Sequence, residues 1–127
     1  MGNMTKNFSR EEFTCKCGCG FNIIDNDLVN IIQEIRDEVN EPIRINSGCR
    51  CAKHNQRVGG VRNSFHLQGK AADLSCKSGG RKIFDAINKL KGEGRLTGLK
   101  YYILYKTKNF VHVDVGRTRN NPYEIRG

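Results

Sequence analysis

Residues 64–73 read SFHLQGKAAD, and this stretch decides how we expect the chain to fold. It contains a histidine, His66, and an aspartate, Asp73, within a frame of glycine and alanine. Far downstream, residues 110–115 read FVHVDV and add a second histidine, His112. Two imidazoles and one carboxylate are a common ligand set for a catalytic zinc ion, which keeps a fourth position open. The sequence therefore predicts that the two segments meet at a metal ion.

The alternation in residues 110–115 predicts a strand with two different faces. His112 and Asp114 would lie on one face, and the valines between them on the other. A core strand does not need two neighbouring ionisable groups on one face, so the polar pair is expected to face a cleft. On its own, His112 would be interpreted as a surface histidine, and the pairing with His66 and Asp73 favours a metal ligand.

A metal centre of this kind would activate water and polarise a substrate carbonyl, and it needs further polar groups around it. Arg50, in the turn formed by residues 47–50, is a candidate because a guanidinium can hold a carboxylate or an oxyanion through two hydrogen bonds. The alternative for Arg50 is a solvated loop arginine. Asp114 would act either as the general base or as the group that orients a metal-bound histidine. We expect Ser64 to support the loop through hydrogen bonds and to line the substrate site.

The remaining sequence predicts several helices and strands. Apolar residues recur at helical spacing over about 27–39 and 81–90, and a capping box formed by Ser9 and Glu12 predicts a helical turn over 8–13. A further short helix is expected over 52–58. Strands are expected over 42–46, 71–75, 99–105 and 110–115, the last two forming a hairpin. The tail from residue 117 onward is expected to be irregular.

Length and composition predict one domain over residues 1–127. The chain has 37% hydrophobic and 28% charged residues, and no apolar run approaches the ~20 residues of a membrane span. The first ten residues lack the apolar segment of an export signal, so we expect a cytoplasmic location. We also expect a monomer without a membrane partner. The net charge of +9 suits a polyanionic partner. Because the basic residues are dispersed and form no nucleic-acid motif, we expect no nucleic-acid partner.

Six cysteines raise the question of a second metal ion. Without an export signal, reduced thiols are the expected state. Cys15, Cys17, Cys19 and Cys51 are candidates for a structural zinc site. Their alternating spacing differs from the usual zinc knuckle, which leaves two residues between paired cysteines, so buried or redox-inactive thiols are the alternative.

Several of these segments together resemble the zinc D-Ala-D-Ala carboxypeptidase family, whose fold is shared by the hedgehog signalling domain. Residues 64–73 resemble its Ser-x-His-x-x-Gly-x-Ala-x-Asp signature, residues 47–50 its Ser-Gly-Tyr-Arg segment, and residues 110–115 its closing metal strand. Residues 13–20 are similar to the N-terminus of small phage and prophage members. The resemblance covers about residues 8–116, which we expect to form the core of the domain, and it implies an α+β fold with an antiparallel sheet and flanking helices. It also implies zinc on His66, Asp73 and His112, with Arg50 engaging the substrate. Many relatives place Glu or Asp three residues before the last zinc histidine, where this chain has Asn109.

The resemblance implies a peptidase that cleaves the stem peptides of bacterial peptidoglycan, as a D,D-carboxypeptidase or an endolysin-type endopeptidase. We expect a phage or prophage product that accumulates in the cytoplasm and acts at the cell wall after release. The alternative is a non-catalytic, zinc-containing module that binds the cell wall or serves as a phage structural part, an interpretation that the missing carboxylate at Asn109 favours.

Overall fold

The computed structural model describes residues 3–20, 22–60, 64–116 and 122–127. Its centre is a five-stranded sheet with the spatial order β1-β2-β4-β3-β5. The strands are β1 (Ile43–Ser47), β2 (Ala71–Cys76), β3 (Tyr101–Tyr105), β4 (Phe110–Asp114) and β5 (Tyr123–Arg126). Neighbouring strands run antiparallel except β3 and β5, which are parallel. The predicted α+β fold is confirmed.

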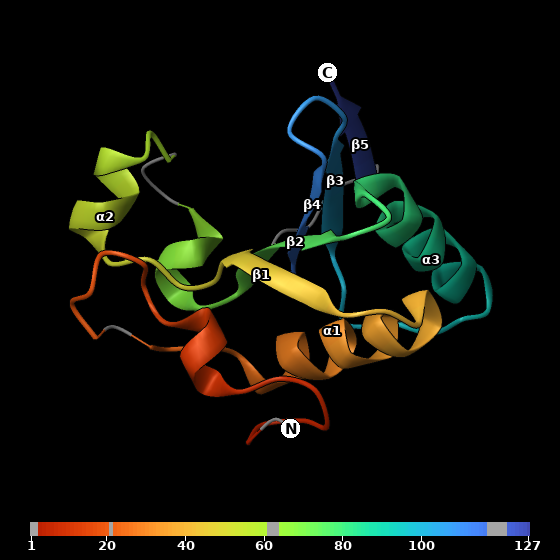
Figure 1. The fold of residues 1–127 in the computed structure, drawn as a ribbon, viewed down its shortest axis with the longest axis horizontal. Helices are drawn as coiled ribbons and strands as arrows, with labels where there is room; N and C mark the ends of the chain where they lie inside the picture. The colour runs from red at the N-terminus through yellow and green to blue at the C-terminus, as the bar shows by residue number, and fades with distance from the viewer. Residues whose placement is uncertain (1–2, 21, 61–63, 117–121) are drawn as a thin grey trace.

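Two amphipathic helices cover one face of this sheet. They are α1 (Asn26–Val39) and α3 (Gly80–Gly92), and Figure 1 shows them side by side along the sheet. The carboxylate of Asp25 begins α1 by accepting hydrogen bonds from the backbone N–H groups of Asp27 and Leu28. The buried aliphatic residues of α1 and α3 pack against Leu74, Val111 and the other side chains on this face of the sheet. This face is therefore the hydrophobic core.

The other face of the sheet is polar. Asp73, His112 and Asp114 are buried there, because the register places them on the side opposite the core residues Leu74, Val111 and Val113. The short elements that cover this region are α2 (Ala52–Arg57) and the 3-10 turn η2 (Phe65–Gln68). Figure 1 shows α2 far from α1 and α3, near the N-terminal loop.

The glycine of the SFHLQGKAAD stretch explains how this segment docks. Gly69 ends η2 with φ of +68°, and a Cβ there would lie 2.4 Å from the carbonyl oxygen of Ile23. The carbonyl of Gly69 also accepts a hydrogen bond of 2.8 Å from the N–H of Asp25. The segment therefore passes directly beside the loop that precedes α1.

Most predicted elements appear close to their expected positions, including a 3-10 turn, η1 (Arg10–Phe13), that carries the predicted capping box. The expectation of an irregular tail from residue 117 onward is wrong for Tyr123–Arg126, which form strand β5 beside β3, while residues 117–121 lie outside the described part of the chain. Three of the four residues of β5 are exposed, and four residues are too few for an apolar–polar alternation to identify a strand. Within the described part of the chain, no helix is long and apolar enough to cross a lipid bilayer.

Candidate metal centre

Sheet register and one turn bring the three predicted metal ligands together. Asp73 on β2 lies directly opposite His112 on β4. His66 comes from η2, and its ring lies against that of His112 with centroids 5.3 Å apart. One donor atom from each of the three residues lies within 4.8 Å of the other two, and all three residues are buried. The convergence predicted from sequence is therefore present in the fold.

Hydrogen bonds fix which nitrogen of His66 faces the other two ligands. Nδ1 lies 2.6 Å from the carbonyl oxygen of Gly48, which can only accept, so Nδ1 carries the proton. Nε2 is left as the lone-pair donor, 3.4 Å from Oδ1 of Asp73. The hydroxyl of Ser64 accepts a hydrogen bond from the backbone N–H of His66 and so holds the start of the turn.

His112 is oriented in the opposite sense. Its Nε2 lies 2.9 Å from Oδ2 of Asp114, and its Nδ1 lies 3.0 Å from Oδ1 of Asp73. When the N–H group at Nε2 donates a hydrogen bond to Asp114, Nδ1 is unprotonated and presents its lone pair to the site. Asp114 is fully buried behind the ring, where an ionised carboxylate needs such a partner. Each imidazole thus has one nitrogen held by the protein and one aimed at the site, a pattern common among metal-ligating histidines.

Charge and burial act against each other in this cluster. Burial alone would raise the pKa of Asp73, but its close contacts with the imidazoles of His112 and His66 hold this pKa below its usual range. For His112, burial would lower the pKa, and the hydrogen bonds to Asp114 and Asp73 raise it instead. The carboxylate is therefore in the ionised form that a metal ion requires.

The donor atoms fit a tetrahedral zinc ion. Zinc–nitrogen and zinc–oxygen bonds of about 2.05 Å give a tetrahedron with edges of about 3.3 Å. Oδ1 of Asp73 lies 3.0 Å from Nδ1 of His112 and 3.4 Å from Nε2 of His66, on either side of that value. Two neutral imidazoles and one carboxylate also match the ligand types that zinc prefers.

Arg50 stands beside the cluster and is itself held in place. Its Nη2 lies 3.5 Å from Oδ2 of Asp73, its Nε donates to the hydroxyl of Ser47, and its Nη1 donates to the side-chain oxygen of Asn55. The Arg50 side chain is only 14% exposed. Arg50 is thus part of the site wall, whereas base rates alone would favour a solvated loop arginine.

The cluster opens into a cavity of about 660 Å³. Among the described residues that line it, the charged side chains other than histidine are Arg50, Asp73, Lys108 and Arg126. The cavity wall therefore carries more positive than negative charge. Ser64 and the ring of Phe65 also contribute to the wall.

Asn109 occupies the position where many relatives carry a carboxylate, and here it has a different role. It adopts a left-handed backbone conformation with φ of +60° in the turn between β3 and β4. Its side-chain oxygen accepts a hydrogen bond of 2.8 Å from the N–H of Gly80 at the start of α3. The side chain thus caps a helix on the core side and is not aimed at the metal cluster.

Strand β5 contributes side chains to the polar face that sequence reasoning missed. Its register with β3 places Glu124 opposite Ile103 and Arg126 opposite Tyr105. The hydroxyl of Tyr101 donates to Glu124, and Arg126 forms an ion pair with the same carboxylate. The only available signal was the Tyr-Glu-Ile-Arg alternation, which is too short to identify a strand without its partner.

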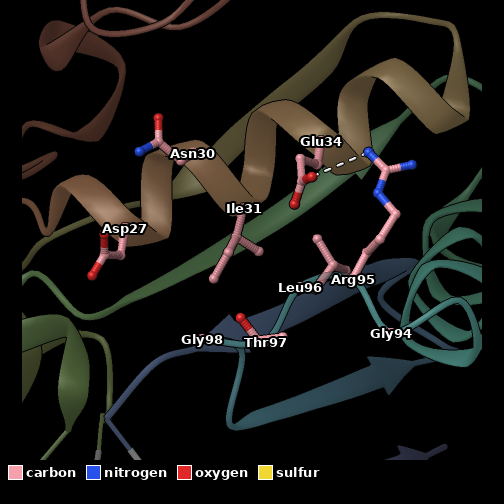
Figure 2. Close-up of a pocket in the computed structure, with 9 residues that line it drawn as sticks. All are labelled: Asp27, Asn30, Ile31, Glu34, Gly94, Arg95, Leu96, Thr97 and Gly98. Carbon is pink, nitrogen blue, oxygen red and sulfur yellow. Dashed lines mark hydrogen bonds and ion pairs between the residues drawn. The ribbon is translucent and has the colours of Figure 1, made fainter.

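A second hollow, of about 450 Å³, lies between α1 and the segment that follows α3 (Figure 2). Arg95 reaches across it to Glu34, with 3.1 Å between Nη2 and Oε1. Both side chains of this pair are well exposed, at 46% and 40%. The hollow shares no lining residue with the His66, Asp73 and His112 cluster, and a surface ion pair joins two of its three charged groups, the third being Asp27.

The structure also brings together the four cysteines named as a possible second metal site. The sulfur atoms of Cys15, Cys17, Cys19 and Cys51 all lie within 4.8 Å of one another. Among the described residues, these two clusters are the groups of three or more histidine, cysteine or acidic side chains that are close enough to share one ion.

A buried His–Asp–His cluster beside a cavity, on the polar face of the sheet, is an arrangement that can hold a metal ion and suits a metal-dependent hydrolase. Residues 6–114 match the sequence model of the Peptidase M15 family, and the chain belongs to that family. This agrees with the resemblance to zinc D-Ala-D-Ala carboxypeptidases. A search of curated individual proteins gave no match.

Proposed function

We propose that the protein is a zinc peptidase that hydrolyses a peptide bond in the stem peptides of bacterial peptidoglycan, as a D,D-carboxypeptidase or an endolysin-type endopeptidase. The observation that carries the proposal is the convergence of Nε2 of His66, Oδ1 of Asp73 and Nδ1 of His112 at the cavity. Membership of the Peptidase M15 family supports the reaction class.

The charge of the cavity supports the substrate class. Stem peptides carry free carboxylates, and the cavity presents Arg50, Lys108 and Arg126 to them. The guanidinium of Arg50 is already oriented by Ser47 and Asn55, so little side-chain entropy is lost when it binds a carboxylate or a carbonyl oxygen. The net charge of +9 also favours a wall that is rich in anionic groups.

The protein's own groups would do the following work. Zinc held by His66, Asp73 and His112 would supply Lewis acidity and make water nucleophilic at neutral pH. Gly48 and Asp114 keep the two imidazoles in the tautomers that present their lone pairs to the site. Arg50 holds the second oxygen of Asp73 and would bind the oxygen of the substrate on which negative charge develops.

We assign Asp114 an orienting role toward His112 and not that of general base. Its carboxylate is fully buried and bonded to Nε2 of His112, and it does not line the cavity. A general base has to reach the attacking water directly or through one water molecule.

We further propose that the protein is a phage or prophage product that acts as a monomer at the wall after release from the cytoplasm.

The test measures release of D-alanine and of new amino termini from purified peptidoglycan. We expect the wild type to cleave, a chelator to abolish cleavage, and added zinc to restore it. Replacement of the substrate-binding arginine, Arg50→Ala, should reduce kcat/KM by ~10²-fold or more, since a donor aimed at developing charge is lost. The matched control is Arg57→Ala, an exposed arginine at the end of α2, which should retain activity.

The alternative is a zinc-containing module without turnover, favoured by Asn109, whose side chain caps α3 in place of a carboxylate at the site. Zinc-loaded protein that binds wall fragments but cleaves no wall preparation would select this alternative. Cleavage that is unaffected by chelators would contradict the zinc mechanism itself.

A further inference from the structure

Four sulfur atoms from two distant segments of the chain lie close together, next to the loop that carries Arg50. Cys15, Cys17 and Cys19 come from the N-terminal loop, and Cys51 directly precedes α2. In Figure 1 this loop and the beginning of α2 lie in the same part of the molecule. We propose that these four cysteines form a second metal site, a closed thiolate site for a single structural zinc ion.

The sulfur spacing is that of a mononuclear tetrahedral site. The Sγ–Sγ distances are 3.5 Å for Cys15–Cys17, 3.8 Å for Cys15–Cys51 and 3.7 Å for Cys17–Cys51. Zinc–sulfur bonds of about 2.3 Å give a tetrahedron with edges of about 3.8 Å. A disulfide would require about 2.05 Å, so none of these pairs is a disulfide. A multi-iron cluster would hold the sulfurs further apart, because several atoms would lie between them.

A tight turn explains how cysteines at alternating positions reach one centre. In an extended strand, residues two apart share a face but stay more than 6 Å apart at about 3.3 Å of rise per residue. Here the N–H of Gly18 donates to the carbonyl of Cys15, and Gly18 adopts φ of +86°. The chain therefore curls around the sulfurs instead of extending past them, which a glycine at this position permits.

Backbone amides support two of the sulfurs. The N–H of Cys51 donates to Sγ of Cys15, and the N–H of His54 donates to Sγ of Cys51, both at 3.4 Å. Such hydrogen bonds stabilise a thiolate and are the outer contacts that orient a metal ligand.

The remaining two cysteines are bonded differently. Sγ of Cys49 donates to the carbonyl of Phe13, and Sγ of Cys76 donates to the carbonyl of Gly79. A thiol that donates to a carbonyl keeps its proton, as a buried structural cysteine does. Cys49 and Cys76 are therefore protonated thiols hydrogen-bonded to the backbone, whereas the other four sulfur atoms face one another.

The position of this site gives it a structural task. Cys51 follows Arg50, whose backbone N–H donates to the carbonyl of His66 at 2.9 Å. The carbonyl of Gly48, in the same loop, accepts from Nδ1 of His66. Zinc on the four thiolates would tie this loop to residues 15–19, and would thereby hold Arg50 and His66 in place without touching substrate.

The test counts zinc ions in protein purified under reducing conditions. We expect two per chain in the wild type, one in Cys51→Ser, one in His66→Ala and two in the matched control Cys76→Ser. In His66→Ala, X-ray absorption should show zinc bound by sulfur alone at about 2.3 Å. Cobalt substitution of that variant should give the intense near-ultraviolet absorption of thiolate ligation.

The His66→Ala variant leaves the four cysteines untouched, so the result does not depend on whether Cys51→Ser folds. A zinc shell of nitrogen and oxygen alone in the wild type, or a chain that loses all zinc in His66→Ala, would overturn the proposal. So would a pair of these cysteines found oxidised in the zinc-loaded protein. A single zinc that survives in His66→Ala and disappears in Cys51→Ser would support this site while contradicting the catalytic centre.

Discussion

At the scale of single residues, the contact between Asp114 and His112 separates two possible roles for the carboxylate. If Asp114 orients His112, Asp114→Ala should weaken zinc binding at the His66, Asp73 and His112 cluster by ~10- to 100-fold. Asp114→Asn keeps a hydrogen-bond acceptor for Nε2 of His112 and should lose less zinc affinity than Asp114→Ala. The measurement is a competition titration with a chromophoric chelator, on variants shown to be folded by circular dichroism.

The opposite result would identify a general base. In that case Asp114→Asn would bind zinc as tightly as the wild type, yet kcat would fall and the acidic limb of its pH profile would disappear. The buried position of Asp114 behind the imidazole ring leads us to expect the first outcome.

The sequence predicts the residue types of the candidate metal centre, but it does not predict the geometry of the cluster. Two histidines and an aspartate suffice to predict zinc, and strand alternation predicts that His112 and Asp114 share a face. Which ring nitrogen faces the site depends on the carbonyl of Gly48, 18 residues from His66, and on no local pattern.

At the scale of elements, Glu41 joins the start of β1 to the loop between β2 and α3. Its carboxylate accepts hydrogen bonds from the backbone N–H and the hydroxyl of Ser78, and Lys82 lies 3.0 Å away. The Ser78 backbone hydrogen bond, followed by Lys82 and the Ser78 hydroxyl, lowers the pKa of Glu41 to about 2. An unfolded glutamate titrates near pH ~4.3.

This shift predicts how stability depends on pH. The stabilisation from Glu41 is complete above the unfolded pKa and is lost as pH falls from ~4.3 toward the folded value of about 2. The difference in urea midpoint between the wild type and Glu41→Gln should therefore be constant near neutrality and shrink below pH ~4. Glu38→Gln, which removes one exposed ion pair with Lys89, is the control and should have little effect at any pH. A wild-type advantage that persists unchanged to pH ~2 would contradict this assignment.

The elements themselves differ in how much sequence reveals them. Helices α1 and α3 have apolar residues at helical spacing because each buries one face, so a window of local sequence is enough. Strand β5 depends on β3, which lies more than fifteen residues earlier and runs parallel to it, and its own side chains are mostly exposed. Pairing between distant segments is not encoded in either segment alone.

At the scale of the whole molecule, the net charge of +9 predicts a strong effect of salt. The Debye length falls from about 10 Å at 0.1 M to about 3 Å at 1 M ionic strength, so attraction between the basic surface and an anionic wall is screened. We expect retention on purified cell walls to decrease as salt rises, and KM to rise more than kcat falls. Co-sedimentation and initial rates across a salt series measure both quantities.

The control uses a short soluble stem peptide in place of whole walls, for which the salt dependence should be weaker because fewer charges interact. Duplex DNA provides the contrast: affinity for DNA that exceeds affinity for the wall at every salt concentration would contradict our expectation that the protein has no nucleic-acid partner.

The pairing of Asp73 with His112 across β2 and β4 has a consequence for metal uptake. The spacing of these two ligands is set by the hydrogen-bonded ladder of the sheet, and that ladder does not depend on an ion. Only His66 comes from outside the sheet, on a turn of four residues. An arriving ion therefore finds a rigid pair of donors and has to recruit just one more, so loading should involve a hinge movement of this turn and leave the strands where they are.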